Sequence, residues 1–165
     1  MAGTETMRIP GAAFLIAVIA ASPVLAACPQ QLAVYEGVDG IGALEFAGGG
    51  AGMHPELRLL YEGVEPVTAY LSHDGTLGRT EVMIPLNCPE GDVTGAELAA
   101  CLVYQGTVYT VAGDGVGQLP AAGGDAAERL FLPNLKVALW QNPQFGDRGP
   151  AEPPAELFRL SGCQE

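Results

Sequence analysis

Residues 79–111 read RTEVMIPLNCPEGDVTGAELAACLVYQGTVYTV, and this stretch decides the predicted fold. Residues 80–86 (TEVMIPL) alternate roughly with a period of two, which predicts a β-strand. Residues 102–111 are rich in β-branched and aromatic side chains and predict a hairpin that turns at Gln105-Gly106. The stretch is the longest well-patterned apolar part of the chain, so we place it in the middle of the core.

A short helix is predicted between these two strand regions, over residues 94–100. Thr94 is suited to cap its start, and Glu97 stands three residues later, which is the spacing of a capping box. Cys88 and Cys101 lie on either side of the helix and would close a short loop if they are paired. We therefore expect a disulfide between them.

Short apolar runs punctuated by glycine and proline make up the rest of the chain, which favours many strands over long helices. The predicted fold class is mostly β: an antiparallel sandwich or open barrel of short strands with one or two short helices, stabilised by disulfides. The alternative fold class is a small α+β arrangement. Residues 113–124 are expected to form a loop and residues 134–141 a short helix. The other strands are expected at 32–35, 41–46, 56–61, 67–71, 129–132 and 157–160.

The first 27 residues have the pattern of an export signal. Residues 12–21 (AAFLIAVIAA) form an apolar run of the length typical of a signal peptide, preceded by Arg8. Val24-Leu25-Ala26 fits cleavage after Ala26, and translation could start at Met1 or at Met7. The sequence thus predicts a signal peptide over 1–27 and a single compact β-rich domain over 28–165.

Cys28 has two alternative roles. Residues 25–28 (LAAC) resemble a bacterial lipobox, in which the cysteine is acylated and becomes the mature N-terminus. Alternatively, Cys28 pairs with Cys163 and ties the two ends of the domain together, which accounts for all four cysteines of an exported chain. We favour this second pairing, and with it a soluble domain over a lipid-anchored one.

The chain carries a formal net charge of −12, and residues 1–27 contain one acid and one base, so cleavage leaves that charge unchanged. Lys136 and five scattered arginines are the only basic side chains after residue 28. A phosphate-binding surface needs clustered Lys or Arg, so nucleic acid is not expected as a partner. A protein or a basic ligand remains as a partner, and a membrane only through a lipid anchor at Cys28. No cofactor is expected.

His54 and His73 are the only histidines. Together with Asp74 they are the candidates for a metal-binding or hydrolytic site, although nothing in their spacing indicates one. Ser72-His73-Asp74-Gly75 favours a turn instead, because a catalytic triad is assembled from positions that are distant in sequence. We expect neither a catalytic residue nor a metal, and leave open that the two histidines converge with a carboxylate.

Aromatic side chains provide the candidates for a recognition surface: Tyr35, Tyr61, Tyr104 and Trp140, with Tyr70 and Tyr109 as further members. The competing interpretation is that most of these side chains lie in strands and pack in the core. The function expected from the sequence is an exported, acidic, non-catalytic binding or accessory domain of the bacterial envelope. A lipoprotein acylated at Cys28 and a histidine-dependent metal-binding or hydrolytic protein are the alternatives.

Overall fold

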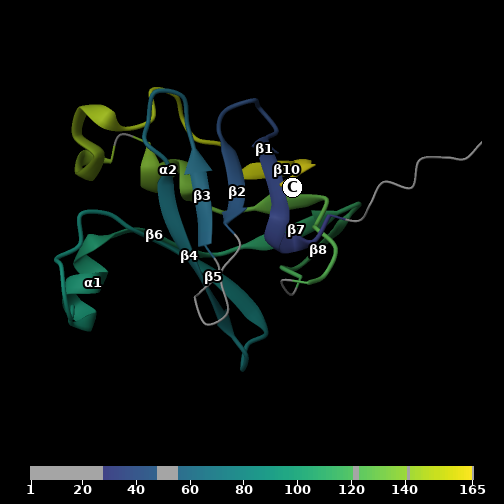
Figure 1. Ribbon diagram of the computed structural model, residues 1–165, viewed down its shortest axis with the longest axis horizontal. Helices are drawn as coiled ribbons and strands as arrows, with labels where there is room; N and C mark the ends of the chain where they lie inside the picture. The colour runs from purple at the N-terminus through teal and green to yellow at the C-terminus, as the bar shows by residue number, and fades with distance from the viewer. Residues whose placement is uncertain (1–27, 48–55, 121–122, 141, 165) are drawn as a thin grey trace, which may run out of the picture.

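Ten antiparallel strands form one sheet in the computed structural model, which describes residues 28–47, 56–120, 123–140 and 142–164. The strand order is β6-β5-β4-β3-β2-β1-β10-β9-β7-β8 (Figure 1). The predicted signal peptide and His54 lie outside the described residues. The prediction of a mostly antiparallel β fold with short helices is confirmed.

The first six strands form a meander in which each strand pairs with the next one along the chain. Tight turns connect most of them, so the sequence neighbours become neighbours in the sheet. The strands are β1 (Ala33–Gly37), β2 (Ala43–Ala47), β3 (Glu56–Leu60), β4 (Val67–Asp74), β5 (Arg79–Pro85) and β6 (Leu102–Thr107).

The remaining four strands complete the sheet on the other side of β1. β10 (Leu157–Cys163) pairs with β1, and β9 (Arg129–Phe131) lies between β10 and β7 (Tyr109–Ala112). β8 (Gly115–Gln118) pairs with β7 and ends the sheet. The C-terminal strand therefore sits beside the N-terminal one, in the middle of the strand order.

The sheet is curled into a half-barrel, in which β6 at one end is followed in the chain by β7 near the other end. β6 begins the strand order, and only Val108 separates it from β7, the second strand from the other end. Val108 is fully buried, and its backbone N–H donates a hydrogen bond to the carbonyl oxygen of Thr80 at 3.0 Å. Of the two predicted architectures, the open barrel is the one that forms.

The hairpin predicted at Gln105-Gly106 is wrong. β6 runs through both residues, with Gly106 paired to Val82 of β5, and the chain continues into β7 without reversing. Gly106 serves a packing purpose rather than a turn, because a Cβ atom there would collide with the hydroxyl of Tyr104. Sequence alone does not distinguish these two uses of glycine.

The loop predicted over 113–124 is also partly wrong, because it contains β8. A tight turn with Gly113 at a φ of +54° joins β7 to β8. All four residues of β8 are exposed, and two of them are glycines. The strand therefore lacks the alternation of buried and exposed side chains on which strand prediction depends.

Alternation is clear in the other strands, and it builds the core. In β5 the side chains of Thr80, Val82 and Ile84 point inward and are buried, while the residues between them are partly exposed. The same period of two fills the inside of the sheet from several strands. The largest fully buried side chains include Tyr35, Leu44, Leu57, Leu59, Ile84, Leu130, Leu132 and Phe158.

Among the described residues, two short α-helices and two 3₁₀ helices accompany the sheet. α1 (Gly95–Cys101) connects β5 to β6, and α2 (Leu135–Leu139) buries Leu135 and Leu139 against the core. The 3₁₀ helix η1 (Gln30–Leu32) precedes β1, and η2 (Pro143–Arg148) follows α2. Both predicted helical regions are thus helical, although α2 is shorter than expected.

The structure contains two disulfides, and they are the two pairs favoured by the sequence. Cys28 pairs with Cys163 across a Cα–Cα distance of 5.7 Å, and Cys88 pairs with Cys101 across 5.2 Å. Both distances lie in the usual range for a disulfide. The first bond joins the ends of the domain, and the second closes the loop that carries α1.

Candidate interaction surface

Residues 88–101, which we call the disulfide loop, project from the end of the sheet (Figure 1). Of residues 89–100 only Val93 is partly buried, and the rest are exposed. The loop therefore adds almost nothing to the apolar core. Its conformation is nevertheless fixed, by the disulfide at its base and by regular helical structure in α1.

The predicted capping box is present at the start of α1 and helps to fix the loop. The Thr94 hydroxyl accepts a hydrogen bond from the Glu97 backbone N–H at 3.3 Å. In return, the Glu97 carboxylate accepts one from the Thr94 backbone N–H at 2.8 Å. These hydrogen bonds hold the pKa of Glu97 below its usual value, and the Thr94 backbone contributes most. The loop therefore keeps this negative charge at neutral pH.

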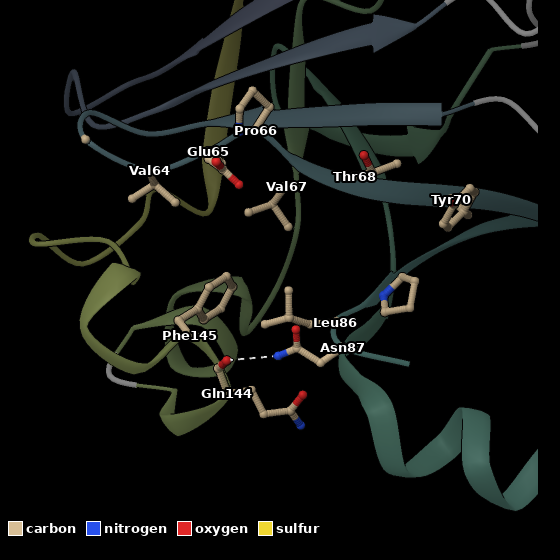
Figure 2. A pocket seen from close by; sticks show the side chains of 12 residues that line it. Val64, Glu65, Pro66, Val67, Thr68, Tyr70, Leu86, Asn87, Gln144 and Phe145 are labelled. Carbon is tan, nitrogen blue, oxygen red and sulfur yellow. Dashed lines mark hydrogen bonds between the residues drawn. The ribbon is translucent and has the colours of Figure 1, made fainter. Parts of the chain in front are cut away.

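A groove of about 410 Å³ lies beside the base of the disulfide loop, and we call it the β4–η2 groove. Figure 2 shows Val64, Glu65 and Val67 along one side of it, and Phe145, Leu86 and Asn87 along the other. Three segments that are far apart in sequence form it: the β3–β4 turn with the start of β4, the end of β5, and η2.

One hydrogen bond joins two sides of this groove, and another ties the groove to the disulfide loop. Asn87 lines the groove directly before Cys88, and its side-chain amide donates to the carbonyl oxygen of Gln144 at 3.2 Å. The backbone N–H of Leu86 donates to the carbonyl oxygen of Cys101 at 2.9 Å. Groove and loop thus form one continuous surface, in which the loop stands beside the groove.

All the charged side chains of this surface are negative. Glu65 lines the groove, and Glu90, Asp92 and Glu97 lie in the disulfide loop. No Lys, Arg or His occurs in residues 63–70, 85–101 or 143–145, which include all the residues that line the groove and form the loop. The lining of the groove mixes polar and apolar side chains, so the surface combines a negative potential with some apolar contact area.

A second groove, of about 520 Å³, lies between β6 and α2. Val103, Gln105 and Thr107 line it from the strand, and Pro133 and Val137 line it from the helical side. None of its lining residues is charged, so it does not indicate the charge of a partner. The β4–η2 groove does indicate the charge of a partner, because a charged side chain lines it.

The structure describes two of the candidate metal-binding or hydrolytic residues, His73 and Asp74, and both belong to a β-hairpin. His73 lies near the end of β4, and its Nδ1 is 3.2 Å from the hydroxyl of Thr80 on β5. Asp74 accepts hydrogen bonds from the backbone N–H groups of Leu77 and Thr76, which lower its pKa. This is the geometry of a turn. No group of three His, Cys, Asp or Glu side chains suited to a metal occurs among the described residues.

The aromatic candidates divide between core and surface. Tyr35, Tyr61 and Tyr104 are at most 8% exposed, so they pack in the core and leave almost no area for a partner. Trp140 and Tyr70 are each 38% exposed. Tyr70 lines the β4–η2 groove, whereas Trp140 follows α2 and does not line that groove. Tyr35, Tyr61 and Tyr104 are therefore core residues, and we no longer place them in a recognition surface.

Sequence reasoning did not single out Glu65, Leu86, Asn87 or Phe145, which the structure brings together at the groove. Glu65 was one of many acidic residues in turns, and Phe145 falls in a proline-rich stretch that predicted a loop. The only available signal was the turn sequence 62–66 (EGVEP), which places an acidic residue at the start of β4.

The fold and surface define a disulfide-bonded, acidic half-barrel domain. The chain matches no protein-family model, curated protein or solved structure in the comparisons made with them. None of the helices in the described ranges is long and apolar enough to cross a membrane. Two disulfides are typical of an oxidising compartment outside the cytoplasm.

Proposed function

We propose that this chain is exported and acts as a non-catalytic binding domain of the bacterial envelope. In this proposal the disulfide loop and the β4–η2 groove together engage a positively charged protein. The observation that carries the proposal is that the loop is structurally fixed while lying almost entirely outside the core.

Fixing an exposed loop has a cost in conformational entropy that no core packing offsets here. Ordering the backbone of one residue costs roughly 1–2 kcal/mol. In the disulfide loop, the bond between Cys88 and Cys101 and the capping box at Thr94 oppose that cost. A loop ordered in advance loses less freedom when a partner binds, so this construction favours binding.

The four carboxylates of the surface determine the kind of partner. Glu65, Glu90, Asp92 and Glu97 form a negative surface with no positive side chain in the groove lining or the loop. Such a surface attracts a positively charged protein, accelerates its approach and disfavours other acidic proteins. The net charge of −12 reinforces this preference over the whole molecule.

The cysteines and the N-terminal sequence support export as a soluble domain. Residues 1–27 have the composition of a signal peptide, and both disulfides fit an oxidising compartment. The sulfur of Cys28 is bonded to Cys163, and one sulfur atom cannot also carry the lipid of a lipoprotein. The disulfide-bonded and acylated forms are therefore mutually exclusive, and we propose the first.

Binding to a short oligolysine peptide tests the binding proposal, with oligoglutamate as the control peptide. We expect salt-dependent binding of oligolysine and none of oligoglutamate. The double variant Glu90→Gln/Asp92→Asn should weaken binding more than Glu36→Gln/Asp114→Asn. The second variant removes the same charge from exposed positions in β1 and in the β7–β8 turn, away from α1 (Figure 1). Equal weakening would mean attraction by net charge alone and would overturn the proposed surface.

The mass of the mature protein from an exporting host tests the localisation. We expect a soluble form that starts at Ala27 or Cys28 and gains four hydrogen atoms on reduction of two disulfides. A form carrying acyl chains in the membrane fraction would show that Cys28 is lipidated. Retention of residues 1–27 in the cytoplasm would contradict export itself.

A further inference from the structure

We infer that the β4–η2 groove receives a single lysine or arginine side chain that projects from the partner. This inference rests on the proposed function, and it assigns the chemistry of the contact at the groove. The groove has apolar side chains, Val64 and Leu86, for an aliphatic stem and one carboxylate for a cationic group. The exposed ring of Tyr70 at the end of the groove completes the arrangement.

Apolar contact is available at two positions of the groove. Val64 and Leu86 are only partly buried and offer apolar surface to an occupant, whereas Val67 and Phe145 are buried and offer almost none. Lysine and arginine carry long apolar stems that pack on such surfaces while the charged end stays hydrated. A short side chain would leave these walls in contact with water, which makes a long one the better occupant.

Glu65 provides the charge that selects a cation. Its side chain lies on the β4 side of the groove among Val64, Pro66 and Val67 (Figure 2). It is the only charged residue that lines the groove, so no basic group competes for it within the lining. A carboxylate without a positive neighbour in the groove attracts cations and repels anions.

Tyr70 strengthens the preference for a cation with an apolar stem. Its side chain is 38% exposed and lines the end of the groove. The face of an aromatic ring attracts an ammonium or guanidinium group.

Single capped amino acids test this inference by NMR, because they isolate the side chain from the rest of the partner. Capped lysine and capped arginine should shift the methyl resonances of Val64, Val67 and Leu86. Capped norleucine, which has the stem of lysine without its ammonium group, should shift them less at the same concentration. Capped glutamate should not shift them. Equal shifts from norleucine and lysine would overturn the inference, because the groove would then be merely apolar.

Matched variants test which carboxylate contributes to lysine binding. Glu65→Gln should weaken lysine binding up to about fivefold, as expected of an exposed ion pair. Glu62→Gln should leave it unchanged, because Glu62 lies in the same turn but does not line the groove. Equal effects of the two variants would overturn the inference.

Oligolysine separates the failure of this inference from failure of the proposed function. If oligolysine binding depends on Glu90 and Asp92 but not on Glu65, the loop binds the partner and the groove does not. The inference is then wrong, and the proposed function stands. If binding depends on none of these residues more than on Glu36 and Asp114, both are wrong.

Discussion

Gln30 and Tyr35 hydrogen bond to each other inside the apolar core. The side-chain amide nitrogen of Gln30 donates to the hydroxyl oxygen of Tyr35 at 3.0 Å, and both residues are at most 1% exposed. The side-chain oxygen of Gln30 also accepts the backbone N–H of Ala127 at 2.9 Å. These contacts join η1 and β1 to the segment before β9 and satisfy polar groups that burial would otherwise make costly.

Removing the hydroxyl of Tyr35 should lower the stability of the protein, whereas removing the hydroxyl of Tyr61 should not. Tyr35→Phe leaves the amide of Gln30 without that partner, so we expect a loss of about 1–3 kcal/mol in the free energy of unfolding. The buried hydroxyl of Tyr61 has no hydrogen-bond partner among the described residues, so Tyr61→Phe should be neutral or stabilising. Urea denaturation measures both. A loss for Tyr61→Phe as large as that for Tyr35→Phe would contradict this assignment.

Stability should fall in alkaline solution because of the buried tyrosines. Burial raises the pKa of Tyr35 to about 12, and burial and the charge of Glu156 raise that of Tyr104 to about 12. Tyrosine in an unfolded chain has a pKa of about 10. The stabilisation is therefore complete below about pH 10 and is lost as the pH rises through about 12, because the unfolded state releases protons first.

Urea denaturation at increasing pH measures this effect. Tyr35→Phe/Tyr104→Phe should have a lower free energy of unfolding at neutral pH, but it should lose less between about pH 9 and pH 11. An identical slope in the variant and the wild type would mean that other groups cause the alkaline loss.

Replacing the capping threonine should loosen α1 locally. Thr94→Ala removes the hydroxyl that accepts the Glu97 N–H, and loss of such a cap costs about 1 kcal/mol. The hydroxyl of Thr94 also donates to the Glu97 carboxylate at 2.8 Å, so the pKa of Glu97 should rise toward its usual value. Hydrogen exchange in α1 and NMR titration of Glu97 measure the two effects. An unchanged pKa together with an intact helix would contradict the capping role.

The two cysteines of the disulfide loop should behave as partners. Cys88→Ser and Cys101→Ser should each lower the free energy of unfolding by about 2–4 kcal/mol, and the double variant should cost little more than either one. Additive losses in the double variant would argue against the pairing. Oligolysine binding by the double variant should also weaken, because the loop is then ordered only when the partner binds.

Much of the fold follows from local patterns in the sequence. The alternation in residues 80–86 predicts β5, and the Thr94 and Glu97 spacing predicts the start of α1. The cysteine pairs follow from the short loop between Cys88 and Cys101 and from the value of joining the chain ends through Cys28 and Cys163. Each of these predictions depends on a few neighbouring residues or on a covalent constraint, and such information is present in the sequence itself.

The remaining features depend on contacts between distant residues. Gly106 lies within a strand, and the absence of a side chain there leaves room for Tyr104, a close approach that the local sequence does not reveal. Tyr35 and Tyr70 are similar strand tyrosines, yet Tyr35 stands at an inward position of β1 and is buried, whereas Tyr70 stands at an outward position of β4 and is exposed.

By itself, the sequence determined the strands that alternate, the capped helix and the acidic charge of this protein, and it favoured the cysteine pairs that form. Only the tertiary structure decided that β6 at one end of the sheet leads through Val108 into β7 near the other end, and which residues form the groove beside the disulfide loop. The physical reason is that hydrogen-bonding patterns and side-chain periodicity act over a few residues. Burial and surface shape arise when segments as distant as Glu65 and Phe145 pack together.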